Sequence, residues 1–185
     1  MRVYFIKKAR QGMKLRKCVR CSEEIKIGEP YRFITPRFGG KRCFCQKHPP
    51  RQSDLTGGKL GELYGIQEGL EDDLVSFQRD GEVDMEASLS EAADEADRIA
   101  DEYEGSIQNM PDSLQQSPVA EECQERAEAS REWAEELRGV TLPEEPGETE
   151  AESEGEEDEE EDEAMDTWRD EVVGEVETAV SALQI

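Results

Sequence analysis

The chain has 185 residues, of which 35% are hydrophobic and 37% are charged, and its net charge is -25. So little apolar material cannot fill one large hydrophobic core, so the chain should divide into smaller parts. No stretch has the apolar segment of a signal peptide or the ~20 apolar residues of a membrane span, so we expect a cytoplasmic protein without membrane association.

The charges are distributed unevenly along the chain. Residues 1–60 hold 16 of the 22 Lys and Arg but only 4 of the 47 Asp and Glu, a net charge of +12. The remaining residues hold 6 basic and 43 acidic side chains, a net charge of -37. The sequence therefore indicates a small basic module followed by a long acidic region.

Residues 1–56 have the pattern of a small β-rich module. Residues 3–6 form a short run with high β propensity, and residues 31–34 and 41–44 read as two strands. Pro36 and the pair Gly39-Gly40 lie between these two strands, which is typical of a β-hairpin connection.

Four of the five cysteines and the only histidine lie between Cys18 and His48. Cys18, Cys21, Cys45 and His48 form a Cys-x2-Cys pair, 23 intervening residues and a Cys-x2-His pair, which is the spacing of a tetrahedral zinc site. Cys43 is a competing ligand, because it could replace Cys45 or join it and leave His48 free. Four protein ligands would make the zinc structural, and its binding would contribute much of the folding free energy.

Residues 57–142 are predicted to form an acidic helical region that resembles a hairpin or a coiled coil. A first helix is expected at about 57–79, although five glycines weaken its helix propensity. Two further helices follow from apolar residues at spacings of three and four, with Ser88 or Ser90 as the cap of the second helix and Cys123 as a core residue of the third. The apolar positions of the last two helices are Leu89, Ala92, Ala96, Ile99, Tyr103, Ile107 and Met110, then Val119, Cys123, Ala127, Ser130, Trp133, Ala134 and Leu137.

The last part of the chain contains an acidic tract and a terminal amphipathic helix. Of the 20 residues 144–163, 14 are acidic and none is basic, so residues 143–163 are predicted to form a disordered linker. Residues 164–185 have apolar side chains on one helical face, which needs a partner within or outside the chain. The predicted fold class is α+β: a zinc-braced β-rich module, a helical hairpin, a disordered acidic linker and a C-terminal amphipathic helix.

The basic module has the composition of a nucleic-acid-binding surface. Cations can neutralise phosphates while aromatic rings stack on bases, and we expect phosphate contacts from Arg32, Arg37, Lys41 and Arg42. The neighbouring aromatic residues are Tyr31, Phe33, Phe38 and Phe44. Two other interpretations stay open: the rings could form the core of the module, or the basic surface could meet the acidic tract of the same chain.

No group of residues has the pattern of a catalytic site, so we expect a protein that is not an enzyme. The single histidine is a predicted ligand, and no glycine-rich phosphate loop precedes a helix. DNA or RNA binding by the basic module is the leading functional hypothesis. The alternative is a protein-interaction factor whose acidic helices and tail bind a protein or imitate nucleic acid.

Several short stretches resemble a family of small acidic proteins encoded by tailed bacteriophages. They cover residues 1–140 in pieces: Lys7-Lys8-Ala9-Arg10, Ile27-Gly28-Glu29-Pro30-Tyr31, Arg37-Phe38-Gly39-Gly40-Lys41, Pro49-Pro50-Arg51-Gln52-Ser53-Asp54-Leu55-Thr56, Asn109-Met110-Pro111-Asp112-Ser113-Leu114-Gln115-Gln116 and Gln124-Glu125-Arg126. The resemblance implies a phage protein in the host cytoplasm, with zinc as an optional brace because some relatives lack the cysteines. The order of Cys-x2-Cys, Gly-Glu-x-Tyr and Cys/His is also similar to small zinc fingers of DNA-break sensors and LIM-like modules. Neither likeness implies an established activity.

Overall fold

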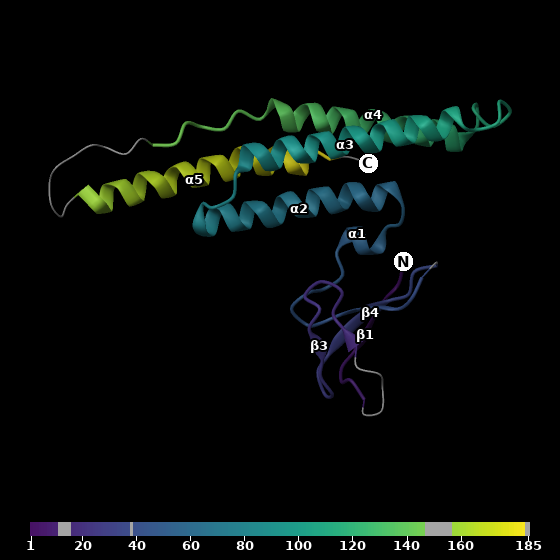
Figure 1. Cartoon of the computed structure of the whole chain (residues 1–185), viewed down its shortest axis with the longest axis horizontal. Coiled ribbons are helices and arrows are strands. Elements are labelled where there is room, and N and C mark those ends of the chain that lie inside the picture. Colours follow the sequence, from purple (N-terminus) through teal and green to yellow (C-terminus); the bar gives the residue numbers. More distant parts are fainter. Residues whose placement is uncertain (11–15, 38, 147–156, 184–185) are drawn as a thin grey trace. The chain divides into compact units, whose positions relative to one another are not determined.

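The structure is a computed structural model that describes residues 1–10, 16–37, 39–146 and 157–183, the side chains of residues 157–162 excepted. The chain forms two compact units, Met1–Gly65 and Ile66–Ile185. The first contains small β-sheets and the second contains packed helices (Figure 1). The predicted α+β class is confirmed.

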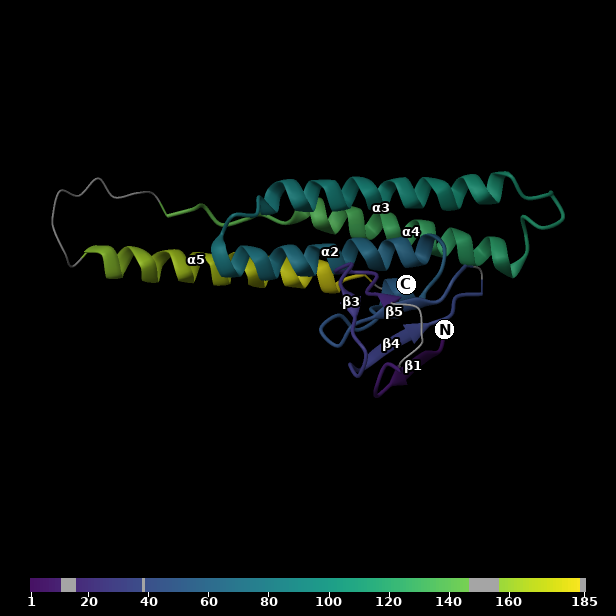
Figure 2. The ribbon, with the colours of Figure 1, turned by 60° about the horizontal axis from the view of Figure 1, so that its bottom comes forward.

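A three-stranded antiparallel sheet forms the centre of the N-terminal unit. It contains β1 (Val3–Ile6), β4 (Tyr31–Ile34) and β5 (Arg42–Phe44) in the order β1-β4-β5, as Figure 2 shows for β1 and β4. The register places Tyr4 opposite Phe33 and Phe33 opposite Cys43. The strands predicted at 3–6, 31–34 and 41–44 therefore exist with nearly the predicted bounds.

A second, smaller sheet pairs β2 (Arg16–Lys17) with β3 (Glu24–Ile25) in antiparallel orientation. The turn between these strands contains Cys18 and Cys21. Ile25, Tyr31 and Cys43 are buried together as a hydrophobic cluster, and Ile6 and Phe33 pack against it. This cluster joins the two sheets.

Two helices follow the sheets. The short α1 (Gln52–Leu55) precedes α2 (Lys59–Asp80), which matches the helix predicted at 57–79. One of the five glycines in this region is required by packing: a Cβ atom at Gly61 would lie 2.5 Å from the carbonyl oxygen of Thr56. Gly81, whose φ is +69°, ends α2, and its N–H donates to the carbonyl oxygen of Phe77 at 2.8 Å.

The helical hairpin consists of α3 (Met85–Gln108) and α4 (Pro118–Gly139), which lie antiparallel and side by side (Figures 1 and 2). The prediction that Ser88 or Ser90 caps this helix is wrong. The helix begins earlier, at Met85, whose side chain is buried. Asp84 caps it, accepting a hydrogen bond from the N–H of Ala87 at 3.0 Å.

Most of the predicted apolar face of α4 is buried, with two differences. Val119 is 57% exposed, because the buried stripe begins one residue later at Ala120. Cys123, predicted as a core residue, is half-buried. Ion pairs cross the hairpin as well: Arg131 contacts Asp101 at 2.8 Å, and Arg138 contacts Asp97 at 2.7 Å.

The C-terminal helix α5 (Glu157–Ser181) begins seven residues before the predicted start at 164. Glu has a high helix propensity, and negative charge is favourable near a helix N-terminus, so acidic residues assigned to the linker can extend this helix. Residues 147–156, which hold much of the predicted linker, lie outside the described residues.

The apolar face of α5 is buried inside the C-terminal unit. Val172 and Val176 are fully buried, and the indole N–H of Trp133 donates to the carbonyl oxygen of Ala179 at 3.0 Å. Phe77 on α2 makes an edge-to-face contact with Trp168, with a distance of 5.5 Å between ring centroids. The terminal helix therefore finds its packing partners within the chain. Across the described residues, no helix combines the length and apolar character needed to cross a membrane.

Replacing Gly61 with Ala should destabilise the protein, whereas replacing Gly69 with Ala should stabilise it. The new methyl group would collide with Thr56 in the first variant, at a cost of about 1–3 kcal/mol, but it meets no atom within 4 Å in the second. There it should add about 0.4–1 kcal/mol through helix propensity. Thermal unfolding followed by circular dichroism measures both effects, and equal effects of the two substitutions would contradict the packing at Gly61.

Candidate metal centre

Two short connections in the N-terminal unit supply four potential ligand atoms. Cys18 directly follows β2 and Cys21 lies in the turn before β3, while Cys45 directly follows β5 and His48 comes three residues later. The sulfur atoms of the three cysteines and a ring nitrogen of the histidine all lie within 4.8 Å of one another. The structure therefore brings together the ligand set that the spacing favoured.

The distances between these atoms fit a single tetrahedral ion. Four ligands at zinc distances would lie about 3.8 Å apart between two sulfurs and about 3.6 Å apart between sulfur and nitrogen. The Sγ atoms of Cys21 and Cys45 are 4.0 Å apart, and Nδ1 of His48 lies 3.2 Å from Sγ of Cys45 and 4.0 Å from Sγ of Cys18. Cys18, Cys21, Cys45 and His48 could thus hold a metal ion.

Backbone hydrogen bonds hold the turn that carries the first two cysteines. The N–H of Ser22 donates to the carbonyl oxygen of Cys18 at 3.0 Å, and Ser22 has a φ of +58°, which closes the turn tightly. The N–H of Val19 donates to the carbonyl oxygen of Cys43 at 2.9 Å. This last bond joins the turn directly to β5, the strand that leads to Cys45.

The surroundings of Cys18 favour its thiolate form. Burial raises the pKa of the Cys18 thiol, but hydrogen bonds from the backbone N–H groups of Cys21, Cys45 and Arg20 outweigh burial and lower the pKa to about 6. At Cys21 the backbone N–H of Glu23 lowers the pKa, yet partial burial and the adjacent Cys18 and Cys45 thiols raise it above the usual value. The Cys18 thiolate, which is suited to bind a cation, therefore lies beside the Cys21 thiol, whose charged form is disfavoured.

Cys43, the competing ligand, lies elsewhere. Its side chain is 6% exposed and packs against Ile25 and Tyr31 in the hydrophobic cluster. It is not among the four residues whose ligand atoms converge. In this structure Cys43 thus serves the core of the module.

Asp54 is a residue of this region that the sequence did not identify. Its carboxylate is only 6% exposed, and its two oxygens accept from Arg42 at 2.8 Å and from Arg20 at 3.0 Å. The backbone N–H of Arg51 also donates to it, at 3.1 Å. Because Arg20 lies in the Cys18 turn and Arg42 in β5, Asp54 connects α1 to both segments that position the ligands.

The residues predicted to contact phosphates do not form one row. Side chains two residues apart share a face of a strand, so Lys41 lies on the face of Phe33 and Cys43, whereas Arg32 and Arg42 lie on the opposite face. Arg42 is engaged by Asp54, and the guanidinium carbon of Arg32 lies 5.6 Å from the ring centroid of Phe5.

Lys41 and Arg37, the other two predicted phosphate contacts, have different surroundings. Lys41 Nζ lies 3.1 Å from the ring centroid of Phe33. Arg37 is exposed, and its neighbour Phe38 lies outside the described residues. Lys41 is therefore placed against an aromatic ring on the Cys43 face of the sheet.

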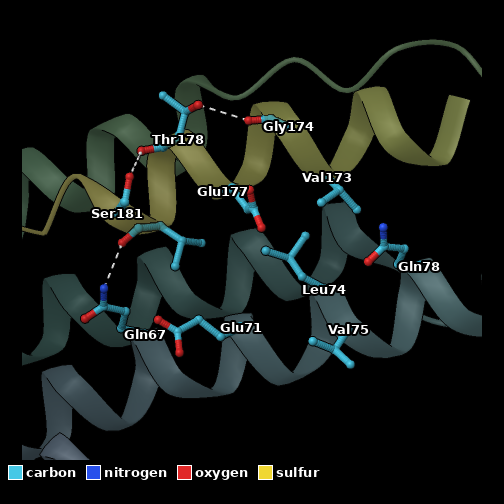
Figure 3. Close-up of a pocket in the computed structure, with 11 residues that line it drawn as sticks. Gln67, Glu71, Leu74, Val75, Gln78, Val173, Gly174, Glu177, Thr178 and Ser181 are labelled. Carbon is cyan, nitrogen blue, oxygen red and sulfur yellow. Dashed lines mark hydrogen bonds between the residues drawn. The ribbon is translucent and has the colours of Figure 1, made fainter. Parts of the chain in front are cut away.

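A groove of about 510 Å³ lies between α2 and α5 in the C-terminal unit (Figure 3). Gln67 donates across it to the carbonyl oxygen of Val180 at 3.2 Å, and Val75 on its wall is 64% exposed. Figure 3 shows Glu177 pointing from α5 toward Leu74 on α2. Its charged lining residues, Glu71 and Glu177, are both acidic.

Comparisons with protein-family models, curated proteins and solved structures gave no match for this chain. The resemblance to phage proteins therefore stays a prediction. The function proposed below depends on the geometry of the N-terminal unit.

Replacing Asp54 with Asn should loosen the N-terminal unit. The substitution leaves Arg20 and Arg42 beside a neutral amide, and we expect the free energy of unfolding to fall by about 2 kcal/mol, less than for a fully buried pair because both guanidinium groups reach solvent. Chemical denaturation measures the loss. Glu24→Gln removes an exposed carboxylate from the same unit and should change stability little. Equal effects of the two variants would show that the ion pairs of Asp54 do not stabilise the unit.

Proposed function

We propose that the N-terminal unit is a zinc-braced module that binds nucleic acid and has no catalytic activity. One observation carries this proposal: aromatic rings on the sheet stack on each other and on basic side chains at the surface of the module. Tyr4 and Phe33 stack with their centroids 4.8 Å apart, and Lys41 lies over Phe33. Aromatic rings flanked by cations are the groups that bind bases and phosphates together.

The donor set supports zinc as the metal. Three thiolates and one imidazole in a tetrahedral arrangement suit Zn²⁺, whereas Mg²⁺ and Ca²⁺ prefer oxygen ligands. Four protein ligands fill the coordination sphere of the ion, and this supports a structural role over catalysis. Zinc would then supply folding free energy that the small hydrophobic cluster cannot supply alone.

The electrostatics of the module support an anionic partner. The net charge of residues 1–60 is +12, and Lys7, Lys8 and Lys17 are exposed. Burial lowers the pKa of Lys41, and the positive charge of Arg16 lowers the pKa further. Phosphate groups near this surface would relieve that repulsion between cations.

The alternative of a protein-interaction factor loses its main support in this structure. The terminal helix suggested an unsatisfied apolar face, but Val172 and Val176 on that face are buried against the other helices of the same unit. The acidic groove between α2 and α5 is the feature that favours protein binding. It would suit an amphipathic segment with basic residues, because Glu71 and Glu177 line it.

Native mass spectrometry should find one zinc ion per chain. Cys45→Ser should abolish or strongly weaken zinc binding, because it removes a converging ligand atom. Cys43→Ser should retain the ion and lower only stability, because Cys43 lies in the hydrophobic cluster. The reverse result, with zinc retained by Cys45→Ser and lost by Cys43→Ser, would show that the assigned ligand set is wrong.

The full zinc-loaded chain should bind DNA or RNA at low salt, with an affinity that falls steeply as salt rises. Lys41→Gln should reduce the slope of log affinity against log salt by about 0.7–1, the amount for one lost phosphate contact. Fluorescence anisotropy across a salt series measures this slope. Arg98→Gln removes an equal charge from α3 and should leave the slope unchanged, and absence of binding at low salt would exclude the proposed function.

A further inference from the structure

We infer that the nucleic acid is single-stranded and that one of its bases stacks on the outer face of the Tyr4 ring, at the β1 edge of the three-stranded sheet. This inference rests on the proposed function and specifies its ligand. It follows from the position of Tyr4 in the sheet, from the ring that supports it and from the cations near the two stacked rings.

Tyr4 lies on β1, which is the edge strand in the order β1-β4-β5. Its cross-strand partner is Phe33, and the two ring planes differ by only 11° with centroids 4.8 Å apart. Phe33 therefore covers one face of the Tyr4 ring. The other face is directed to the side of β1 where a further strand of the sheet would lie, and Tyr4 is 42% exposed.

The Phe33 ring, on which Tyr4 stacks, is held in place by its own packing. Phe33 is half-buried and packs against the cluster that contains Tyr31 and Cys43, and its ring lies 6.3 Å from that of Tyr31. Tyr31 is buried, and the guanidinium carbon of Arg16 lies 5.2 Å from its ring centroid. A base that stacked on Tyr4 would therefore meet a ring already held in place, and little conformational entropy would be lost on binding.

A cation lies near each of the two stacked rings. Lys41 Nζ lies 3.1 Å from the centroid of Phe33, and the guanidinium carbon of Arg2 lies 5.9 Å from the centroid of Tyr4. Arg2 is exposed and its side chain is long, so it can move from the ring to a phosphate when a base takes its place. The base would then extend the existing stack while Arg2 contacts the backbone of the same strand.

A single strand fits this arrangement better than a duplex. In a duplex the faces of the bases are covered by their neighbours, and a side chain at a sheet edge can reach them only by unstacking. In a single strand the bases can leave their stack and lie against an aromatic ring, and the contact does not depend on base identity because every base has a π face. DNA and RNA single strands both offer this chemistry.

Phe5 provides a control within the same strand. It follows Tyr4 and is also exposed, but adjacent residues of a strand point to opposite faces of the sheet. Its partner across the strands is Arg32 rather than an aromatic ring. Phe5 thus matches Tyr4 in exposure and aromatic character while it lacks the supporting ring.

The experiment uses the full zinc-loaded chain and short oligonucleotides that contain 2-aminopurine, a fluorescent base that is quenched when it stacks. Wild-type protein and Tyr4→Phe should bind the single strand and quench its fluorescence. Tyr4→Leu should bind about tenfold more weakly and without quenching, while its salt dependence stays unchanged. Phe5→Leu should behave as wild type, and a duplex of the same sequence should bind more weakly than the single strand.

The possible results separate this inference from the proposed function. Salt-dependent binding that Tyr4→Leu leaves intact in both affinity and quenching would overturn the stacking site and leave nucleic-acid binding standing. Equal or tighter binding of the duplex would overturn the preference for single strands. Equal losses in Phe5→Leu and Tyr4→Leu would show that the contact is not at Tyr4. Absence of binding by any oligonucleotide would contradict both proposals. The same measurements on a DNA and an RNA oligonucleotide of equal sequence would show which sugar is accepted. Zinc content, measured for each variant, confirms that the module is folded.

Discussion

The N-terminal unit depends on the meeting of two turns that are 23 residues apart in the sequence. Hydrophobic burial alone does not bring three thiols and an imidazole together, and the buried cluster beside them contains few side chains. Backbone bonds prepare the meeting, because the turn at Cys18 is tied to β5 through the N–H of Val19. Asp54 then joins the same turn and the same strand to α1. A bound metal ion would make these separate constraints into one rigid module.

The C-terminal unit uses its few cations in a different way. The six basic residues after residue 65 are all arginines, and each makes an ion pair with a neighbouring carboxylate. Arg131 and Arg138 join α4 to α3, so they reduce the repulsion between two strongly acidic helices. Two of the six arginines thus join neighbouring helices and the other four pair with a carboxylate on their own helix, whereas many of the basic residues of the N-terminal unit face solvent. The basic residues of the two units therefore differ in what they contact as well as in number.

Patterns that depend on short periods could be predicted from the sequence, and features that depend on the meeting of distant residues could not. Apolar residues at spacings of three and four placed α3 and α4, and the paired ligand spacing placed Cys18 and Cys21 with Cys45 and His48. The strands β2 and β3 have two residues each, too few for any periodicity.

Three further features could not be settled from the sequence, because each depends on residues that are distant from one another along the chain. The role of Asp54 arises only when Arg20 and Arg42 approach it from different segments, although its place among only four acidic residues in a basic module was a signal that could have been used. The stack of Tyr4 on Phe33 required the register of β1 against β4. Burial of the α5 face likewise depends on Trp133, which lies 46 residues before the carbonyl it binds.

The stretch from Lys41 to Cys45, which contains β5, carries residues of three kinds at intervals of two. Lys41 lies over the aromatic stack, Cys43 is in the hydrophobic cluster, and Cys45 packs against that cluster while its sulfur joins the ligand group. Inserting or deleting one residue between Lys41 and Cys45 would turn at least one of these side chains to the opposite face of the sheet. Over evolutionary time this stretch can therefore accept substitutions far more readily than changes of length.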